Sequence, residues 1–132
     1  MSTKVKLSSD VSTKLQFLSN RLDIRRNLIA RMAFGYALNA INIPVDPTDS
    51  NGQEFNRVTL TGKYDALFRL LMSEKEERLI VDDEFFPIKL KEYVEYGVNQ
   101  LYLQYMKINS PGEFLIFLLS DEKVQTKLSE PE

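Results

Sequence analysis

The chain has 132 residues, enough for one compact domain, and its 43% hydrophobic and 27% charged residues are typical of a globular protein. It contains no run of about eighteen apolar residues and starts without the apolar segment of a secretion signal, so we expect a cytoplasmic protein without membrane contact. It has no cysteine and no histidine. This excludes disulfides, thiolate metal sites, thiol-borne sulfur and Ser–His catalysis. We predict no cofactor, no metal site and no catalytic residue.

The charge is distributed unevenly. Residues 1–40 hold seven basic and two acidic residues, whereas residues 41–132 hold ten basic and seventeen acidic ones. A basic end on an acidic body suggests a face that binds a polyanion, although an arginine-rich solvated helix surface would give the same count. The predicted DNA-binding residues are Lys4, Lys6, Lys14, Arg21, Arg25, Arg26 and Arg31.

The first forty residues predict a strand, a helix, a turn and a second helix. Lysines alternate with Val5 and Leu7, as in a short strand with one apolar face. Helical spacing of apolar residues follows over residues 11–22 and again over 26–39. This order resembles a ribbon–helix–helix DNA-binding unit, in which the strands of two chains pair. The resemblance implies that Lys4 and Lys6 face DNA; the alternative is that both belong to a disordered terminus.

The start of the second helix offers a further means of binding phosphate. Backbone N–H groups at a helix N-terminus have no partner within the helix, and the helix dipole favours an anion there. In this sequence two guanidinium groups, Arg25 and Arg26, stand at that point.

The rest of the chain predicts a long loop and a helical body. The loop covers residues 42–62, with a brief extended piece at 58–60, and a helix follows over residues 63–77. Residues 79–81 fit either the end of that helix or a strand. We interpret the carboxylates of residues 82–84 as a solvated helix start rather than a metal site.

Two further helices complete the predicted body. One has Pro87 in its first turn and runs to about residue 108. Tyrosines around much of it suggest a central helix or a subunit contact. The other begins at a capping box, Ser110 to Glu113, and its apolar residues 114–119 should be docked. A polar tail ends the chain. We therefore predict one mainly α-helical, oligomeric domain with a basic unit (1–40), a loop (42–62), a helical body (63–119) and a tail (120–132).

The most distinctive segment is the eleven-residue block GQEFNRVTLTG at residues 52–62, followed by Asp-Ala-Leu-Phe at 65–68. With the basic helices before it, the block resembles the DndE family, the small subunit of the bacterial DNA phosphorothioation (Dnd) system. The resemblance covers roughly residues 5–72. It implies a mostly helical, tetrameric protein that binds double-stranded DNA, preferably nicked, beside the other Dnd subunits. The acidic pI, about 5.3, departs from that expectation.

The side chains of the block allow two interpretations. In one, Gln53 and Arg57 contact phosphate while Glu54 and Asn56 order the loop. In the other, Glu54 pairs with Arg57, Asn56 caps backbone groups and Phe55 anchors the loop to the core. We favour the second, because polar residues in long loops commonly satisfy the chain itself.

The function expected from the sequence is a non-catalytic DNA-binding component of phosphorothioate modification. Two alternatives remain. One is a ribbon–helix–helix transcriptional repressor, which would read bases through its strand. The other is a protein-interaction scaffold that does not bind DNA.

Overall fold

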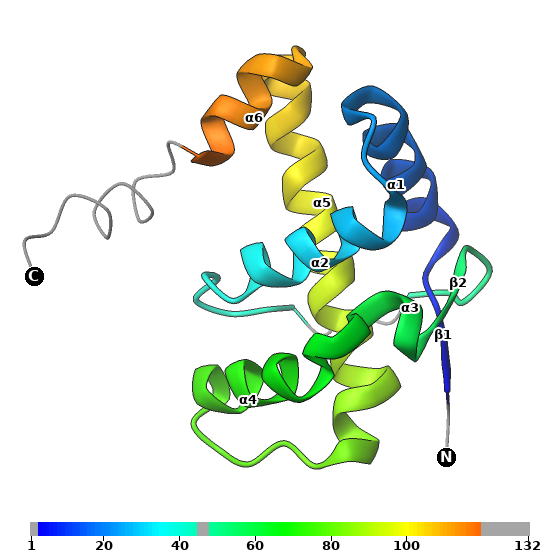
Figure 1. Cartoon of the computed structure of the whole chain (residues 1–132), viewed down its shortest axis with the longest axis vertical. Helices are drawn as coiled ribbons and strands as arrows, with labels where there is room; N and C mark the ends of the chain where they lie inside the picture. The colour runs from blue at the N-terminus through cyan, green and yellow to red at the C-terminus, as the bar shows by residue number, and fades with distance from the viewer. Residues whose placement is uncertain (1–2, 45–47, 120–132) are drawn as a thin grey trace, which may run out of the picture. The chain divides into compact units, whose positions relative to one another are not determined.

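The computed structural model describes residues 3–44 and 48–119, which are mainly α-helical, as predicted (Figure 1). The predicted tail lies outside the described residues. The chain divides into two compact units, residues 1–102 and residues 103–132. None of the helices in the described ranges is long and apolar enough to cross a membrane.

A two-stranded antiparallel sheet opens the first unit. Strand β1 (Lys4–Lys6) pairs with β2 (Glu54–Asn56), and Val5 lies opposite Phe55. Both of these apolar side chains are buried while their neighbours along each strand are exposed, which is the two-residue alternation of a strand with one covered face. The predicted N-terminal strand is confirmed, and its partner comes from the same chain.

The two helices of the N-terminal unit follow as predicted. Helix α1 (Ser9–Leu22) starts at Ser8, whose hydroxyl accepts a hydrogen bond from the Val11 N–H. It ends at Asp23, whose left-handed backbone (φ 56°) stops the helix. Helix α2 (Arg26–Ala37) buries small and aromatic side chains against the core. The buried residues of the two helices are Val11, Leu15, Leu18, Leu22, Ile29, Ala30, Ala33, Phe34 and Ala37.

The loop before β2 is tied to the start of α1. The Gly52 N–H donates to the Leu7 carbonyl, and the Leu7 N–H donates to the Gln53 carbonyl. The Gln53 N–H donates to the Ser12 hydroxyl at 2.7 Å. Gly52 lies so close to the start of α1 that a Cβ there would be 2.3 Å from the Ser8 backbone carbonyl oxygen, which cannot move aside. A glycine is therefore required where the block meets α1.

The second half of the block forms a helix, so the extended piece predicted at residues 58–60 is wrong. Helix α3 covers Arg57–Thr61, and a 3₁₀ turn, η1 (Gly62–Tyr64), leads into α4 (Asp65–Glu76). The β-branched residues in this stretch suggested a strand, but Leu60 and Thr61 become buried together on one side of a helical turn. The strand lies just before, in β2.

Helix α5 (Leu90–Ile108) packs against α2 and carries much of the core. A Cβ on Gly97 would be 2.0 Å from the Ala33 carbonyl oxygen, so the two helix backbones touch there. Pro87 precedes this helix instead of opening it, within the irregular segment η2 (Glu84–Lys89). Residues 79–81, for which the sequence left helix or strand open, adopt neither.

The second unit contains the end of α5 and helix α6 (Pro111–Leu119). The predicted cap is present, since the Glu113 N–H donates to the Ser110 hydroxyl at 3.4 Å. Phe114 is fully buried and meets the edge of the Tyr105 ring at 5.4 Å. The predicted docking of residues 114–119 is made through Phe114, whereas Ile116 on the same helix is 63% exposed.

Candidate nucleic-acid interface

A solvent-open hollow of about 580 Å³ forms where the start of α2 meets the motif block. Polar and basic groups from α1, the α1–α2 turn, α2, β2 and α3 converge on it. The lining residues are Gln16, Ser19, Arg25, Arg26, Asn27, Gln53, Glu54, Phe55, Asn56 and Thr59. The fold therefore joins two segments that the sequence singled out separately, the paired arginines and the GQEFNR block.

The N-terminus of α2 supplies the positive end of a helix to this hollow. Arg25 occupies the N-cap position with an extended backbone (φ −59°, ψ 144°), and no side chain caps this end of the helix. Arg25 and Arg26 are both exposed, so their charges are open to a ligand. A helix start with two guanidinium groups is chemically suited to a phosphate.

Arg26 is held in place by two glutamines. Its Nη1 donates to the side-chain oxygen of Gln16 at 2.8 Å and to that of Gln53 at 2.6 Å. Gln53 thus links the block to the arginine, and its oxygen accepts a hydrogen bond from a cation. This geometry makes Gln53 a positioning group for Arg26.

Arg57 is used inside the fold. It makes a two-pronged contact with Asp65 (2.8 Å and 2.8 Å) and another with Asp82 (2.6 Å and 3.1 Å). Its guanidinium also lies 5.4 Å from the Phe85 ring centre and 5.0 Å from that of Phe86. Only 18% of its side chain is exposed. Arg57 therefore joins α3, the start of α4 and the segment that precedes α5.

The charge partners shift each other's ionisation. The hydrogen bonds from Arg57 lower the pKa of both Asp65 and Asp82, and the two carboxylates raise the pKa of Arg57. The predicted Glu54–Arg57 pair is wrong, since Glu54 instead lies 3.5 Å from Lys4 across the two strands. The pair does not form because Glu54 lies in β2 whereas Arg57 begins α3, so the two side chains point in different directions.

Two other expectations for the block have different outcomes. The burial of Phe55 is confirmed, at 5% exposed. Asn56 stands at the N-cap of α3, but its side chain makes no capping hydrogen bond, so the predicted capping role is wrong.

Arg31 also contributes to the internal structure. Its Nε donates to the Leu60 carbonyl at 2.8 Å, and its Nη2 donates to the Thr59 carbonyl at 3.1 Å. The side-chain amide of Asn27 reaches the Thr59 carbonyl as well, at 3.3 Å. These bonds satisfy carbonyls at the end of the short α3 and fasten it to α2.

The other predicted DNA-binding residues lie outside the hollow. Lys4 and Lys6 are exposed on β1, on the side opposite Val5. Lys14 contacts Asp10 at 2.9 Å and the Asn99 side chain at 2.8 Å. The guanidinium of Arg21 lies 5.1 Å from the Phe17 ring centre. The structure therefore brings together only Arg25 and Arg26 of the predicted basic set.

Sequence reasoning missed Gln16, Ser19, Asn27 and Thr59 as site residues. Gln16 and Ser19 are three residues apart, so they share the polar side of α1. The sequence shows that spacing, but it does not show that the polar side of α1 lies next to the GQEFNR block. That contact depends on the tertiary fold.

Comparisons with known proteins agree with this fold. The family model of the DNA sulphur modification protein DndE matches residues 4–109. The structure of DndE from Escherichia coli B7A, involved in DNA phosphorothioation modification, is similar with a TM-score of 0.63 and 18% identity over 76% of this chain and 97% of that one. A mutant DndE involved in DNA phosphorothioation gives 0.58 and 19%, with the same coverage. No curated protein matches the sequence. Because the family model matches most of this chain, the chain belongs to the DndE family.

Proposed function

We propose that this protein is a non-catalytic DNA-binding component of the phosphorothioate modification machinery. The observation that carries the proposal is the hollow at the start of α2, where an uncapped helix end, Arg25 and Arg26 meet the block that resembles the DndE family. Duplex DNA presents phosphates along its whole length, and such a site takes a phosphate without reading its base.

The proposed role is to hold DNA for other subunits of the same system. The sequence contains no cysteine, so a persulfide must be carried by another protein. We propose a preference for nicked duplex, because a strand break lets the backbone bend and enter a concave site more easily than an intact duplex can. We also propose that the protein works as a homo-oligomer, with a tetramer as the expected state.

The experiment compares one DNA sequence in three forms. Fluorescence anisotropy measures binding to intact, nicked and single-stranded DNA at two salt concentrations. We expect the nicked duplex to bind most tightly and all affinities to fall as salt rises. The variant Arg25→Ala/Arg26→Ala should bind every sequence more weakly, with a log–log salt slope smaller by about two.

The matched control removes two exposed positive charges elsewhere. Lys63→Ala/Lys107→Ala has the same net charge as the arginine variant, and neither residue lines the hollow. Equal loss of affinity in both variants would show that overall charge, and not this site, governs binding. Light scattering on the same samples measures the oligomer.

The same titration separates the alternatives. Strong preference for one DNA sequence over random DNA would favour a ribbon–helix–helix repressor. No binding to any DNA at low salt would leave the scaffold interpretation. Either result would refute the proposed function.

A further inference from the structure

Strand β1 has one paired edge and one open edge. Among the residues that the structure describes, it pairs with β2 alone. The Leu7 N–H donates to the Gln53 carbonyl, so these two residues are a hydrogen-bonded pair of the antiparallel ladder. Such pairs occur at every second residue, and the N–H and carbonyl of Lys6 therefore point away from β2. Neither group has a hydrogen-bond partner in the described part of the chain.

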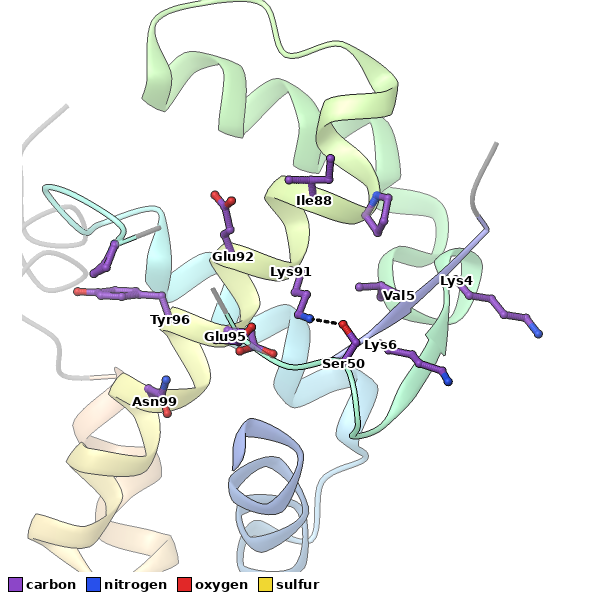
Figure 2. Close-up of a pocket in the computed structure, with 13 residues that line it drawn as sticks. Lys4, Val5, Lys6, Ser50, Ile88, Lys91, Glu92, Glu95, Tyr96 and Asn99 are labelled. Atoms are coloured by element: carbon purple, nitrogen blue, oxygen red, sulfur yellow. Dashed lines mark hydrogen bonds between the residues drawn. The ribbon is translucent and has the colours of Figure 1, made fainter. Parts of the chain in front are cut away.

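The open edge of β1 faces a cavity of about 510 Å³ that extends to the first half of α5. Every residue of β1 lines this cavity, and no residue of β2 does. Figure 2 shows the side chains of Lys4 and Lys6 pointing away from it, so both residues contribute main chain to the wall. An extended polypeptide entering the cavity would meet an unpaired strand edge, which is a template for a further strand.

The cavity also has an apolar wall beside this edge. The side chain of Val5 points into it, and Ile88 and the ring of Tyr96 add to the wall from the opposite side (Figure 2). Side chains along a strand alternate between its two faces. The residue of an added strand that lies opposite Val5 would therefore place its side chain in the cavity, where an apolar group is buried most favourably.

The charges next to the open edge are mainly positive. Lys4 and Lys6 are exposed on the other face of β1, and only Lys4 has a carboxylate at hand, Glu54 at 3.5 Å. Lys91 stands in the cavity wall, and its ammonium group donates to two uncharged oxygens of residues 49 and 50, each at 2.9 Å. An incoming chain would thus meet three lysines.

The acidic groups of the cavity wall are already engaged. Glu92 lies 3.5 Å from the Lys89 ammonium. Glu95 is buried and accepts the Ser8 N–H at 2.6 Å. Opposite charges on neighbouring strands stabilise a sheet, so acidic residues suit the two positions beside the β1 lysines.

We propose that the open edge of β1 binds an extended segment of a partner protein in which an apolar residue is flanked by acidic ones. The main chain of the segment hydrogen-bonds to Lys6, and its apolar side chain packs on Val5. A second copy of β1 fits less well, because pairing two copies around Val5 places Lys4 of one opposite Lys6 of the other. This site lies apart from the hollow at the start of α2, and the proposal stands without DNA binding.

The test titrates the full chain with short peptides, acetylated and amidated at their ends, in the absence of DNA. The probe is Thr-Glu-Val-Glu-Thr, and its control carries N-methyl groups on both glutamates, which removes backbone donors at unchanged charge. We expect the probe to bind at least ten times more tightly than this control. Amide hydrogen exchange should slow at Lys6, while the Val5 amide, which faces β2, should change little.

Two variants at one position isolate the backbone donor of β1. Lys6→Pro removes the N–H and the charge, whereas Lys6→Ala removes the charge alone. Proline is tolerated at an open strand edge, so both variants should fold. We expect Lys6→Pro to bind the probe at least ten times more weakly than Lys6→Ala does. If Lys6→Pro unfolds, the wild-type comparison of the two peptides still decides.

Three results would overturn the proposal. Equal affinity for the plain and N-methylated peptides, or an unchanged exchange rate at Lys6, would exclude strand addition. Failure of the probe to bind would exclude the site itself. Tighter binding of the peptide Thr-Lys-Val-Lys-Leu, which has the sequence of β1 and its flanks, would identify a second copy as the occupant instead.

Discussion

Replacing Arg57 tests whether the motif block acts first on structure. Arg57→Ala removes four hydrogen bonds and leaves two carboxylates, Asp65 and Asp82, without their shared cation. A hydrogen bond to a charged group is worth about 1.5–3 kcal/mol, and a fully buried pair that loses one partner costs more. Here the two carboxylate side chains are about one-third exposed, at 32% and 36%, so water partly compensates them. We expect a loss of about 2–3 kcal/mol in the free energy of unfolding.

The assay is urea denaturation followed by circular dichroism at several pH values. The folded-state pKa of Asp65 lies below its ordinary value of 3.8 because Arg57 hydrogen-bonds to its charged form. The stabilisation is therefore complete above the unfolded pKa and is lost as pH falls through the lower folded pKa. Wild-type protein should lose this stability below about pH 4, and Arg57→Ala should lose much less over the same range.

A double-mutant cycle with Asp65→Asn adds a direct measure of coupling. If the two residues interact, the double variant should cost less than the sum of the single ones. An unfolding free energy within about 0.5 kcal/mol of wild type for Arg57→Ala would contradict the structural role. If DNA affinity fell at the same time, Arg57 would belong to the DNA site instead. We expect folded Arg57→Ala to bind DNA like wild type.

Three further substitutions test the parts that hold the hollow together. Phe55→Ala should cost about 3 kcal/mol or more by thermal or urea denaturation, because the ring is buried opposite Val5, while Val58→Ala, at a side chain 78% exposed, should cost little. Gly97→Ala should lower stability by about 1–3 kcal/mol, since its Cβ would lie 2.0 Å from a backbone oxygen of α2 that has no flexible end to move; an unchanged melting temperature would contradict this packing. Arg31→Ala should weaken DNA binding indirectly by loosening α3, and hydrogen exchange at Leu60 and Thr61 should then speed up, whereas slow exchange with weak binding would indicate a direct phosphate contact.

The sequence predicted the local features well because each depends on a short pattern. Alternation around Val5 predicts β1, and helical spacing predicts the ends of α1 and α2 to within two residues. The Ser110 cap is equally local. These features need no knowledge of the rest of the chain.

The partners of the charged residues were not predictable in the same way. Arg57 binds Asp82, which is 25 residues further along the chain, because the segment after α4 returns to the start of α3. Its nearest carboxylate in sequence, Glu54, lies opposite Lys6 on the neighbouring strand and contacts Lys4 diagonally at 3.5 Å, and the sequence does not state this strand pairing. A pairing of this kind is decided by topology. The sequence therefore identified the important residues of the block but misassigned their contacts.

The structure also explains how an acidic protein can present a basic site. Arg31 donates a hydrogen bond to a backbone carbonyl within the fold. Asp65 and Asp82 form ion pairs with Arg57, and none of these three residues lines the hollow. Local field, rather than net charge, decides whether an anion is attracted.

The size of the site sets a limit on affinity. The hollow contributes two exposed arginines, and β1 adds two exposed lysines nearby in the sheet, one of them paired with Glu54. One chain would then neutralise about two or three phosphates, which corresponds to a log–log salt slope of about −2 to −3. Binding by a single copy would be weak at physiological salt. Several copies on one DNA would multiply the contacts, so the proposed DNA binding and the proposed oligomer depend on each other, and a variant that dissociates into monomers should lose both affinity and salt slope together.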